Sequence, residues 1–115
     1  DSLVASLLKY TWRTSNASRL GKFYFMDPRF SEVSDRYTFN TSHHPQVYTV
    51  EGADALEPAD STVITLARYA ENNMSAAISW KGDYDVVAFG FPFEAIIDRK
   101  ERDSIMRKIL NFMLN

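Results

Sequence analysis

The chain has 115 residues, a formal net charge of -2 and no cysteine. This length suits one domain, and a hydrophobic core of that size forms without covalent staples. The lack of cysteine excludes disulfides, thiolate catalysis and zinc–thiolate sites. The thirteen basic residues are scattered along the chain, and no apolar run reaches the ~18 residues of a membrane-spanning helix. We therefore expect neither a nucleic-acid-binding face nor a membrane span.

The first 45 residues begin with a helical pattern and then become irregular. Ser2 is a suitable N-cap, and the leucine spacing after it predicts an amphipathic helix to about Trp12. Residues 22 to 26 form a predicted strand, which the Asp27-Pro28 pair ends. Residues 27 to 45, which include Arg29 and Phe30, have no clear period, and an irregular stretch of this length is often functional.

Alternating and β-branched patterns predict several strands after this stretch. The first is expected over residues 46 to 50, and residues 53 to 60, which include Pro58, are expected to form a loop. Three further strands are predicted over residues 62 to 69, 75 to 80 and 84 to 91. The short turns between these three predict an antiparallel meander over residues 61 to 91.

The last predicted element is a helix with Asp98 as its cap. Its apolar residues form two adjoining stripes: Ile105, Ile109 and Phe112, and then Met106, Leu110 and Met113. Such a wide apolar face is expected to pack on the meander. The predicted fold class is mixed α/β, with N- and C-terminal helices packed on a sheet in a single module over residues 1 to 115.

Residues 61 to 115 also carry a family resemblance. The strand order, the Asn72-Asn73 and Lys81-Gly82-Asp83 turns, the Gly90-Phe91-Pro92-Phe93-Glu94 stretch and the capped helix resemble the end of class I glutamine amidotransferase-like domains. Those domains are flavodoxin-like and include the ThuA-like proteins. The match is closer to domains of large secreted bacterial proteins labelled xanthan lyase. The resemblance implies a partial flavodoxin-like domain.

The resemblance also implies that the catalytic residues are missing from this chain. True amidotransferases use a cysteine nucleophile and a histidine within a Phe-His-Pro-Glu stretch. Here that stretch corresponds to Phe91-Pro92-Phe93-Glu94, so that the carboxylate persists without the histidine. Without nucleophile and base the chemistry cannot run. Because the chain opens at Asp1 within a helical pattern, we expect a fragment or C-terminal domain of a longer protein.

Five residues are candidate ligand contacts. Glu94 follows an apolar strand, at a strand end where α/β folds often bind ligands. Arg68, within a strand, suits either a carboxylate or sugar hydroxyl ligand or an ordinary ion pair, and Trp80 suits either a sugar ring or the core. His43 and His44 share a loop, but a metal site needs three or four ligands. We therefore predict an exposed polar loop there, with no metal and no cofactor.

Three functions stay open at this point. The first is a non-catalytic accessory or structural domain of a larger extracytoplasmic bacterial protein linked to polysaccharide processing. The second is a fragment of a hydrolase or lyase whose catalytic residues lie upstream. The third is a glycan- or peptide-binding module that uses the aromatic residues between Phe23 and Tyr48. For this chain alone we expect no enzymatic activity. The extracytoplasmic location rests on the resemblance only.

The expected partners follow from the same reasoning. They are the upstream domains of the same polypeptide and carbohydrate. A sheet edge left free by truncation also predicts self-association, because unpaired backbone groups on an edge strand attract another strand.

Overall fold

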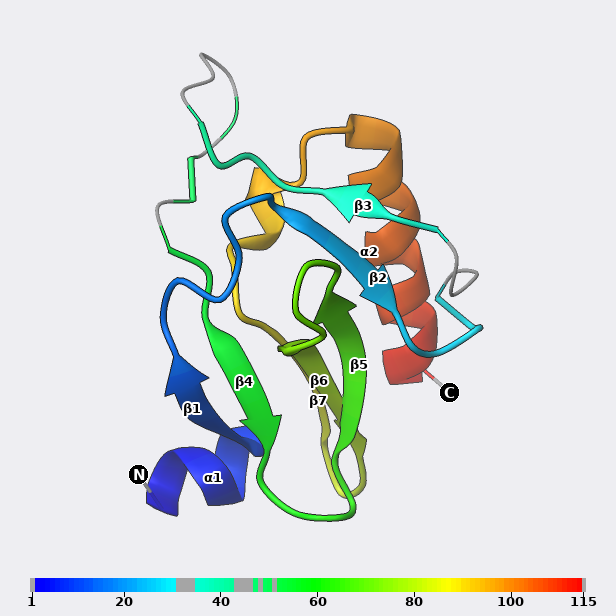
Figure 1. The fold of residues 1–115 in the computed structure, drawn as a ribbon. Coiled ribbons are helices and arrows are strands. Elements are labelled where there is room, and N and C mark those ends of the chain that lie inside the picture. Colours follow the sequence, from blue (N-terminus) through cyan, green and yellow to red (C-terminus); the bar gives the residue numbers. More distant parts are fainter. Residues whose placement is uncertain (1, 31–34, 43–46, 48, 51, 115) are drawn as a thin grey trace.

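The computed structural model describes residues 2–30, 35–42, 47, 49, 50 and 52–114 (Figure 1). In chain order the elements are α1 (Ser2–Leu8), β1 (Tyr10–Thr14), β2 (Lys22–Phe25), β3 (Tyr37–Thr38), β4 (Ala55–Pro58), β5 (Ile64–Tyr69), β6 (Ser75–Lys81), β7 (Asp85–Phe89), the short 3-10 helix η1 (Phe93–Ala95) and α2 (Arg99–Leu114). The described strands form a five-stranded sheet in the order β3-β2-β5-β6-β7 and a two-stranded ribbon of β1 and β4.

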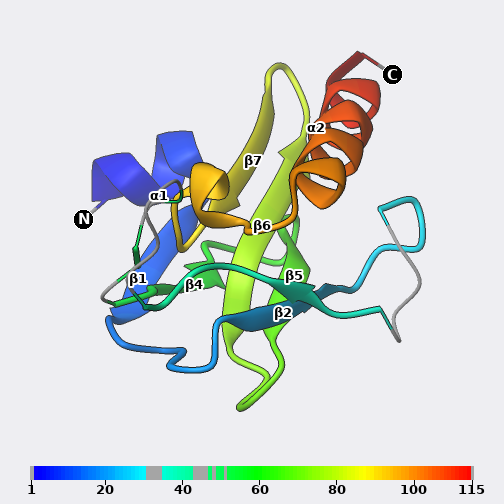
Figure 2. The same ribbon diagram turned by 90° about the horizontal axis from the view of Figure 1, so that it is seen from above.

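The predicted meander is confirmed as β5, β6 and β7. Strand β6 lies in the middle, and its residues from Ser75 to Ser79 are all buried. The turn between β5 and β6 places Asn73 at a φ of 59°, a left-handed conformation that asparagine tolerates. The pairing of β5 with β6 shifts register on both sides of Ala67, and such bulges increase local twist. The sheet accordingly curls, so that β2 crosses β6 at a steep angle (Figure 2).

The five-stranded sheet is covered on both faces. On one face, Val87 and Phe89 join the large core that contains the buried stripe of α2. On the other face, Val86 and Ala88 pack with Leu56 of the β1–β4 ribbon. Figure 2 shows α2 and this ribbon on opposite sides of β6. The mixed α/β class is therefore confirmed, with one helix and one ribbon enclosing the sheet.

Helix α2 begins as predicted, but it buries a narrower face than expected. The Asp98 carboxylate accepts hydrogen bonds from the backbone N–H groups of Lys100 (2.8 Å) and Glu101 (3.1 Å), which confirms the cap. Ile105, Ile109 and Phe112 are buried. The second predicted stripe is exposed: Met106, Leu110 and Met113. Each residue of that stripe is rotated by about 100° from its neighbour in the first, so the sheet face that covers the first stripe leaves the second exposed.

The predicted helix to Trp12 is wrong beyond Leu8. Lys9 adopts a φ of 69°, which ends the helix, and Tyr10–Thr14 forms strand β1. Its partner is β4, in the stretch expected to be a loop. Threonine and aromatic side chains favour an extended chain, and Pro58 is tolerated because it closes a strand at the rim of a two-stranded ribbon. The pairing of β1 with β4, which is distant in the sequence, therefore determines the structure of both segments, and the helical spacing of apolar residues does not.

The strand expected over residues 46 to 50 does not form in its described part. Val47, Thr49 and Val50 lie outside any strand, and residues 46 and 48 lie outside the described residues. Asn40 holds this segment instead: its carbonyl accepts from the Val50 N–H (2.9 Å), and its side-chain amide donates to the Thr49 hydroxyl (3.2 Å). A local asparagine network thus replaces the sheet ladder.

Two further expectations concern the membrane and the family fold. None of the helices in the described part of the chain combines the length and the apolar character needed to cross a membrane, which agrees with the prediction. All strand pairs between the described residues are antiparallel. A flavodoxin-like domain is built on parallel strands, so that part of the expectation is not confirmed.

A carboxylate clamp ties the turn after β5 to the connection between β1 and β2. Glu71 accepts hydrogen bonds from the Ser18 hydroxyl and from the backbone N–H groups of Arg19 (3.2 Å) and Leu20 (3.3 Å). Asn72 donates to the Ala17 carbonyl (2.5 Å). Partial burial acts to raise the pKa of Glu71, but these hydrogen bonds outweigh it and leave the pKa below its ordinary value.

We expect Asp98→Ala to destabilise the protein by about 1 kcal/mol, because the first turn of α2 loses its cap. This should lower the melting temperature by roughly 4 °C in a thermal melt followed by circular dichroism. Asp103→Ala is the matched control, since Asp103 is exposed on the same helix. Equal melting temperatures for the two variants would argue against the capping role.

We expect the advantage of the wild type over Glu71→Gln to depend on pH. A carboxyl whose pKa is lowered by folding stabilises the folded state above its unfolded value of 4.5, and this contribution is lost as the pH falls through the lower folded value. The difference in melting temperature between the two proteins should therefore be full at pH 7 and shrink below pH 4.5. A difference that stays constant down to pH 3 would contradict the clamp.

Candidate functional site

Two of the predicted site residues, Arg68 and Trp80, do not come together. Arg68 lies opposite Ser75 at the start of β6, whereas Trp80 lies near the end of that strand. Five residues of strand separate these positions, which is roughly 16 Å. Arg68 donates to the backbone carbonyl of Asn73 (2.8 Å) and so closes the turn after β5. It holds its own sheet together in place of the predicted ion pair or ligand.

Trp80 is half-buried and packs between the meander and the N-terminal elements. Its ring lies 4.8 Å from the Tyr84 ring, and the Lys9 ammonium lies 4.0 Å from its centre. The Tyr84 hydroxyl donates to the carbonyls of Ser6 (3.2 Å) and Leu7 (3.0 Å) at the end of α1. A sugar stacking on Trp80 would have to replace the lysine, so the ring serves the fold.

Of the remaining candidates, Glu94 lies within the described residues. Glu94 is exposed on η1, and its backbone carbonyl accepts a bond from Arg102 (3.4 Å). His43 and His44 lie outside the described residues. Within the described ranges, no three His, Cys, Asp or Glu side chains gather as metal ligands would.

The aromatic residues between Phe23 and Tyr48 are largely core. The buried ones in the described part are Phe23, Phe25, Phe30 and Phe39. Their rings contact one another and Tyr37 at centroid distances from 5.2 to 6.2 Å. Buried rings offer no platform to a ligand, so this stretch supplies packing more than recognition.

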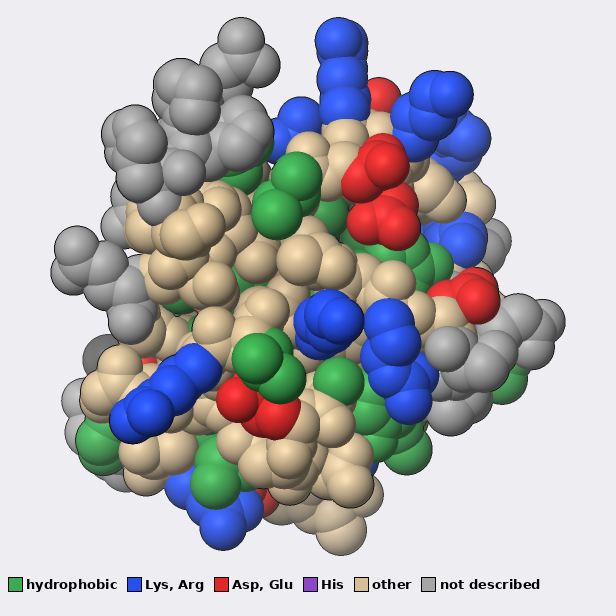
Figure 3. Space-filling model, turned by 45° about the horizontal axis from the view of Figure 1, so that its top comes forward, with side chains coloured by type: hydrophobic (Ala, Val, Ile, Leu, Met, Phe, Trp, Pro, Cys, Tyr) green, Lys and Arg blue, Asp and Glu red, His purple; other side chains and the backbone are tan. Residues whose placement is uncertain are grey.

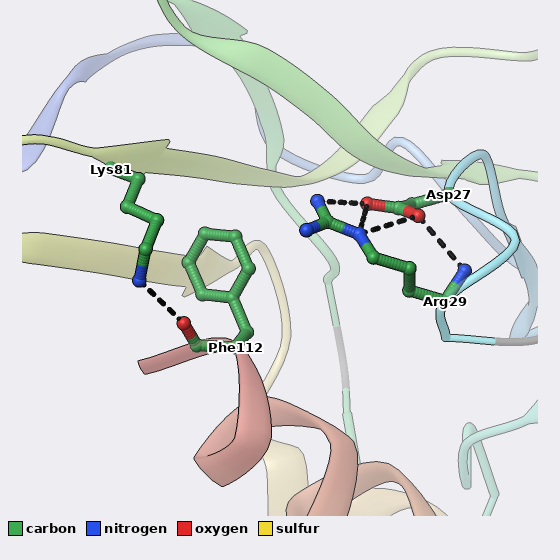
Figure 4. A network of polar contacts seen from close by, with 4 residues as sticks. All are labelled: Asp27, Arg29, Lys81 and Phe112. Atoms are coloured by element: carbon green, nitrogen blue, oxygen red, sulfur yellow. Dashed lines mark hydrogen bonds and ion pairs between the residues drawn. The ribbon is translucent and has the colours of Figure 1, made fainter. Parts of the chain in front are cut away.

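A basic hollow of about 360 Å³ is the strongest candidate site. It lies between the segment after β2, the end of β6 and the last turns of α2, and its lining residues are Arg29, Phe30, Lys81, Lys108, Asn111 and Phe112. Figure 4 shows Arg29 and Lys81 reaching toward the Phe112 ring from opposite sides. The Arg29 guanidinium lies 5.6 Å and the Lys81 ammonium 5.0 Å from the centre of that ring.

The fold fixes the position of each cation. Arg29 forms an ion pair with Asp27 at 2.7 Å, whose hydrogen bonds lower the pKa of Asp27 and raise that of Arg29, so both stay charged. Lys81 donates to the Phe112 carbonyl (2.7 Å) and pairs with Asp85 (3.1 Å). Lys108 donates to the Phe30 carbonyl. The two lysines thereby satisfy backbone carbonyls at the hollow.

The hollow keeps a positive excess. Among the described residues, its three cations face two carboxylates, Asp27 and Asp85, which leaves one positive charge over. In the described part of the chain, no carboxylate lies within ion-pair distance of Lys108. An ammonium carries three N–H donors, and the Phe30 carbonyl takes one. The hollow can therefore donate hydrogen bonds to an anion.

A second hollow, of about 400 Å³, is lined by Asn16, Ser18, Arg19, Thr41 and Val50. It is a weaker candidate for an anion because Glu71 already takes the Ser18 hydroxyl and the Arg19 backbone N–H. On the face seen in Figure 3, Lys and Arg side chains are interspersed with acidic ones.

Sequence reasoning pointed to only one of the segments that line the basic hollow. It marked residues 27 to 45, with Arg29 and Phe30, as a stretch of functional character. No sequence pattern marked Lys81 or Lys108 as a ligand contact, since Lys81 was expected in a turn and Lys108 on a helix surface. They reach Arg29 only because the sheet curls and α2 ends beside β6.

No family model, curated protein or solved structure matches this chain.

We expect Lys81→Met to lower stability by about 1 kcal/mol, because the Phe112 carbonyl near the end of α2 loses a charged donor. Thermal melts can test this against Lys22→Met, since Lys22 is exposed on β2. Lys81→Met should have the lower melting temperature. Equal melting temperatures for the two variants would contradict a stabilising role of the bond from Lys81 to the Phe112 carbonyl.

Proposed function

We propose that this chain is a non-catalytic accessory domain that binds the carboxylate group of an acidic saccharide in the basic hollow. The observation that carries the proposal is the convergence of Arg29, Lys81 and Lys108 on one hollow, with a single positive charge in excess among the described residues. Charge-assisted hydrogen bonds from such groups are the usual way to hold a carboxylate.

The size and lining of the hollow favour a sugar acid over other anions. One excess positive charge suits a single carboxylate better than a doubly charged phosphate. A volume of about 360 Å³ lies at the small end of ligand pockets. Asn111 adds an amide that both donates to and accepts from hydroxyl groups, and Phe30 and Phe112 give an apolar wall for C–H groups. These features together fit one sugar ring.

The wider setting is proposed from the family resemblance. An ending like that of the amidotransferase-like domains in secreted bacterial proteins supports a place in a larger extracytoplasmic protein that acts on polysaccharide. Binding an acidic sugar would hold such a protein on its polymer. In this proposal the domain contributes affinity for the polymer, and other parts of the polypeptide carry out the chemistry on it.

The test is a calorimetric titration with oligomers of galacturonic acid, compared with neutral galactose oligomers of the same length. We expect binding of the acidic oligomer alone, weakened by added salt. Lys108→Gln should weaken it about tenfold, as loss of one charge-assisted bond predicts.

Arg13→Gln is the control for that titration, because Arg13 is an exposed cation on β1 paired with Glu57 and lies outside the lining of the hollow. It should leave the affinity unchanged. Equal binding of neutral and acidic oligomers, or equal losses in Lys108→Gln and Arg13→Gln, would refute a site in the hollow.

A further inference from the structure

Among the described strands, β7 forms a bare edge of the five-stranded sheet. It is the last strand in the order β3-β2-β5-β6-β7. All five of its residues are half-buried, whereas most of β6 beside it is buried. Because both faces of β7 pack against the core clusters, this exposure comes from its outer side.

The hydrogen-bond pattern identifies which backbone groups point outward. The Gly90 N–H donates to the Ala76 carbonyl (2.8 Å), and the Gly82 N–H donates to the Tyr84 carbonyl (3.1 Å). The register between these bonds runs without a shift. In an antiparallel ladder every second residue bonds to its neighbour strand, so Val86 and Ala88 face β6. The N–H and C=O groups of Asp85, Val87 and Phe89 therefore face away from the sheet.

The opposite edge of the same sheet is closed. Strand β3 has two residues, and the Ile97 N–H donates to its Thr38 carbonyl (3.0 Å). The adjacent Asn40 N–H donates to the Ala95 carbonyl (2.8 Å). The segment before α2 thus covers β3. In the described part of the chain no further strand pairs with β7, and β7 lacks three of the features that protect an edge strand, namely proline, lysine and a bulge.

We infer that β7 pairs with β7 of a second copy of this chain, antiparallel and with its two-fold axis at Val87. In this register Val87 faces its own counterpart, and Asp85 faces Phe89 of the other copy. The outward groups of all three residues then meet as hydrogen-bonded pairs, which gives six bonds between the copies. Two five-stranded sheets become one continuous sheet.

The side chains suit this self-pairing. Val86 comes opposite Ala88 and Val87 opposite Val87, so small apolar groups meet on both faces. The only charge on the strand is Asp85, already paired with Lys81 of its own chain. The two Asp85 residues lie four positions apart across the pair, about 13 Å, which exceeds the screening length of about 8 Å at physiological salt. A foreign strand would lack this built-in match.

Engineered cysteines can test the register, because the native chain has none. We expect disulfide-linked dimers when Val86→Cys and Ala88→Cys proteins are mixed under mild oxidation, since these positions face each other within disulfide reach. Each variant alone should cross-link far less, because its cysteine would lie diagonally from its own copy. Equal cross-linking alone and mixed, or none in the mixture, would overturn the proposed pairing.

Light scattering provides the second test. The wild type should shift from monomer to dimer between low micromolar and millimolar concentration. Val87→Pro should stay monomeric at every concentration, since it removes the outward N–H at the centre of the pairing, while Val86 and Ala88 keep their bonds to β6. A wild type that is monomeric throughout, or a folded Val87→Pro protein that still dimerises, would refute an interface on β7. If Val87→Pro does not fold, the cysteine mixture decides.

Discussion

The packing of the Phe91 ring holds the sheet together, because it joins strands from both halves of the chain. The ring stacks on Phe39 at a centroid distance of 4.3 Å and lies 4.9 Å from Phe23 and 6.4 Å from Tyr69. Aromatic pairs of this kind contribute about 0.5–1.5 kcal/mol each beyond the area they bury. The position is reached through Gly90, where a Cβ would lie only 1.9 Å from the Asp54 carbonyl oxygen. That close approach lets the Asp54 N–H donate to the Gly90 carbonyl (2.7 Å) and the Tyr69 hydroxyl donate to the Asp54 carbonyl (2.6 Å). These two bonds position the β1–β4 ribbon against the sheet.

This constraint also explains what became of the Phe91-Pro92-Phe93-Glu94 stretch. Once Phe91 is drawn into the core, the chain turns at Pro92 and forms the short helix η1, whose Glu94 points to solvent. The carboxylate singled out by the resemblance is therefore exposed on η1, whereas Arg68 closes a turn and Trp80 contacts Lys9 next to α1. Of the candidates that sequence reasoning named, Arg68 and Trp80 make contacts within the fold. The residues that line the basic hollow drew little notice, because polar residues are brought together there by packing and by no motif.

How far the sequence predicts the fold depends on the range of the interactions involved. The meander was predicted because its turns are local, as was the start of α2, where Asp98 bonds to backbone groups two and three residues away. The β1–β4 ribbon was missed because Tyr10 pairs with Pro58, far along the chain, and no local pattern reports that contact. The alternation around Val47 misled because Asn40 forms hydrogen bonds with Thr49 and Val50, in the place that a neighbouring strand would take.

The two proposals meet at one pair of residues. Lys81 lines the basic hollow and Asp85 begins the bare edge strand, and the two form an ion pair. The cations of the hollow are held in place before a ligand arrives, which lowers the entropy lost on binding, but each has already given donors to the protein. One hollow should therefore bind a single sugar acid weakly. A polysaccharide repeats the same group along its length, and two copies joined through β7 would present two hollows on one rigid sheet. Once one hollow has bound the polymer, the second hollow binds it at high effective concentration. Pairing through β7 would therefore raise the overall affinity for the polysaccharide without any new contact to the sugar.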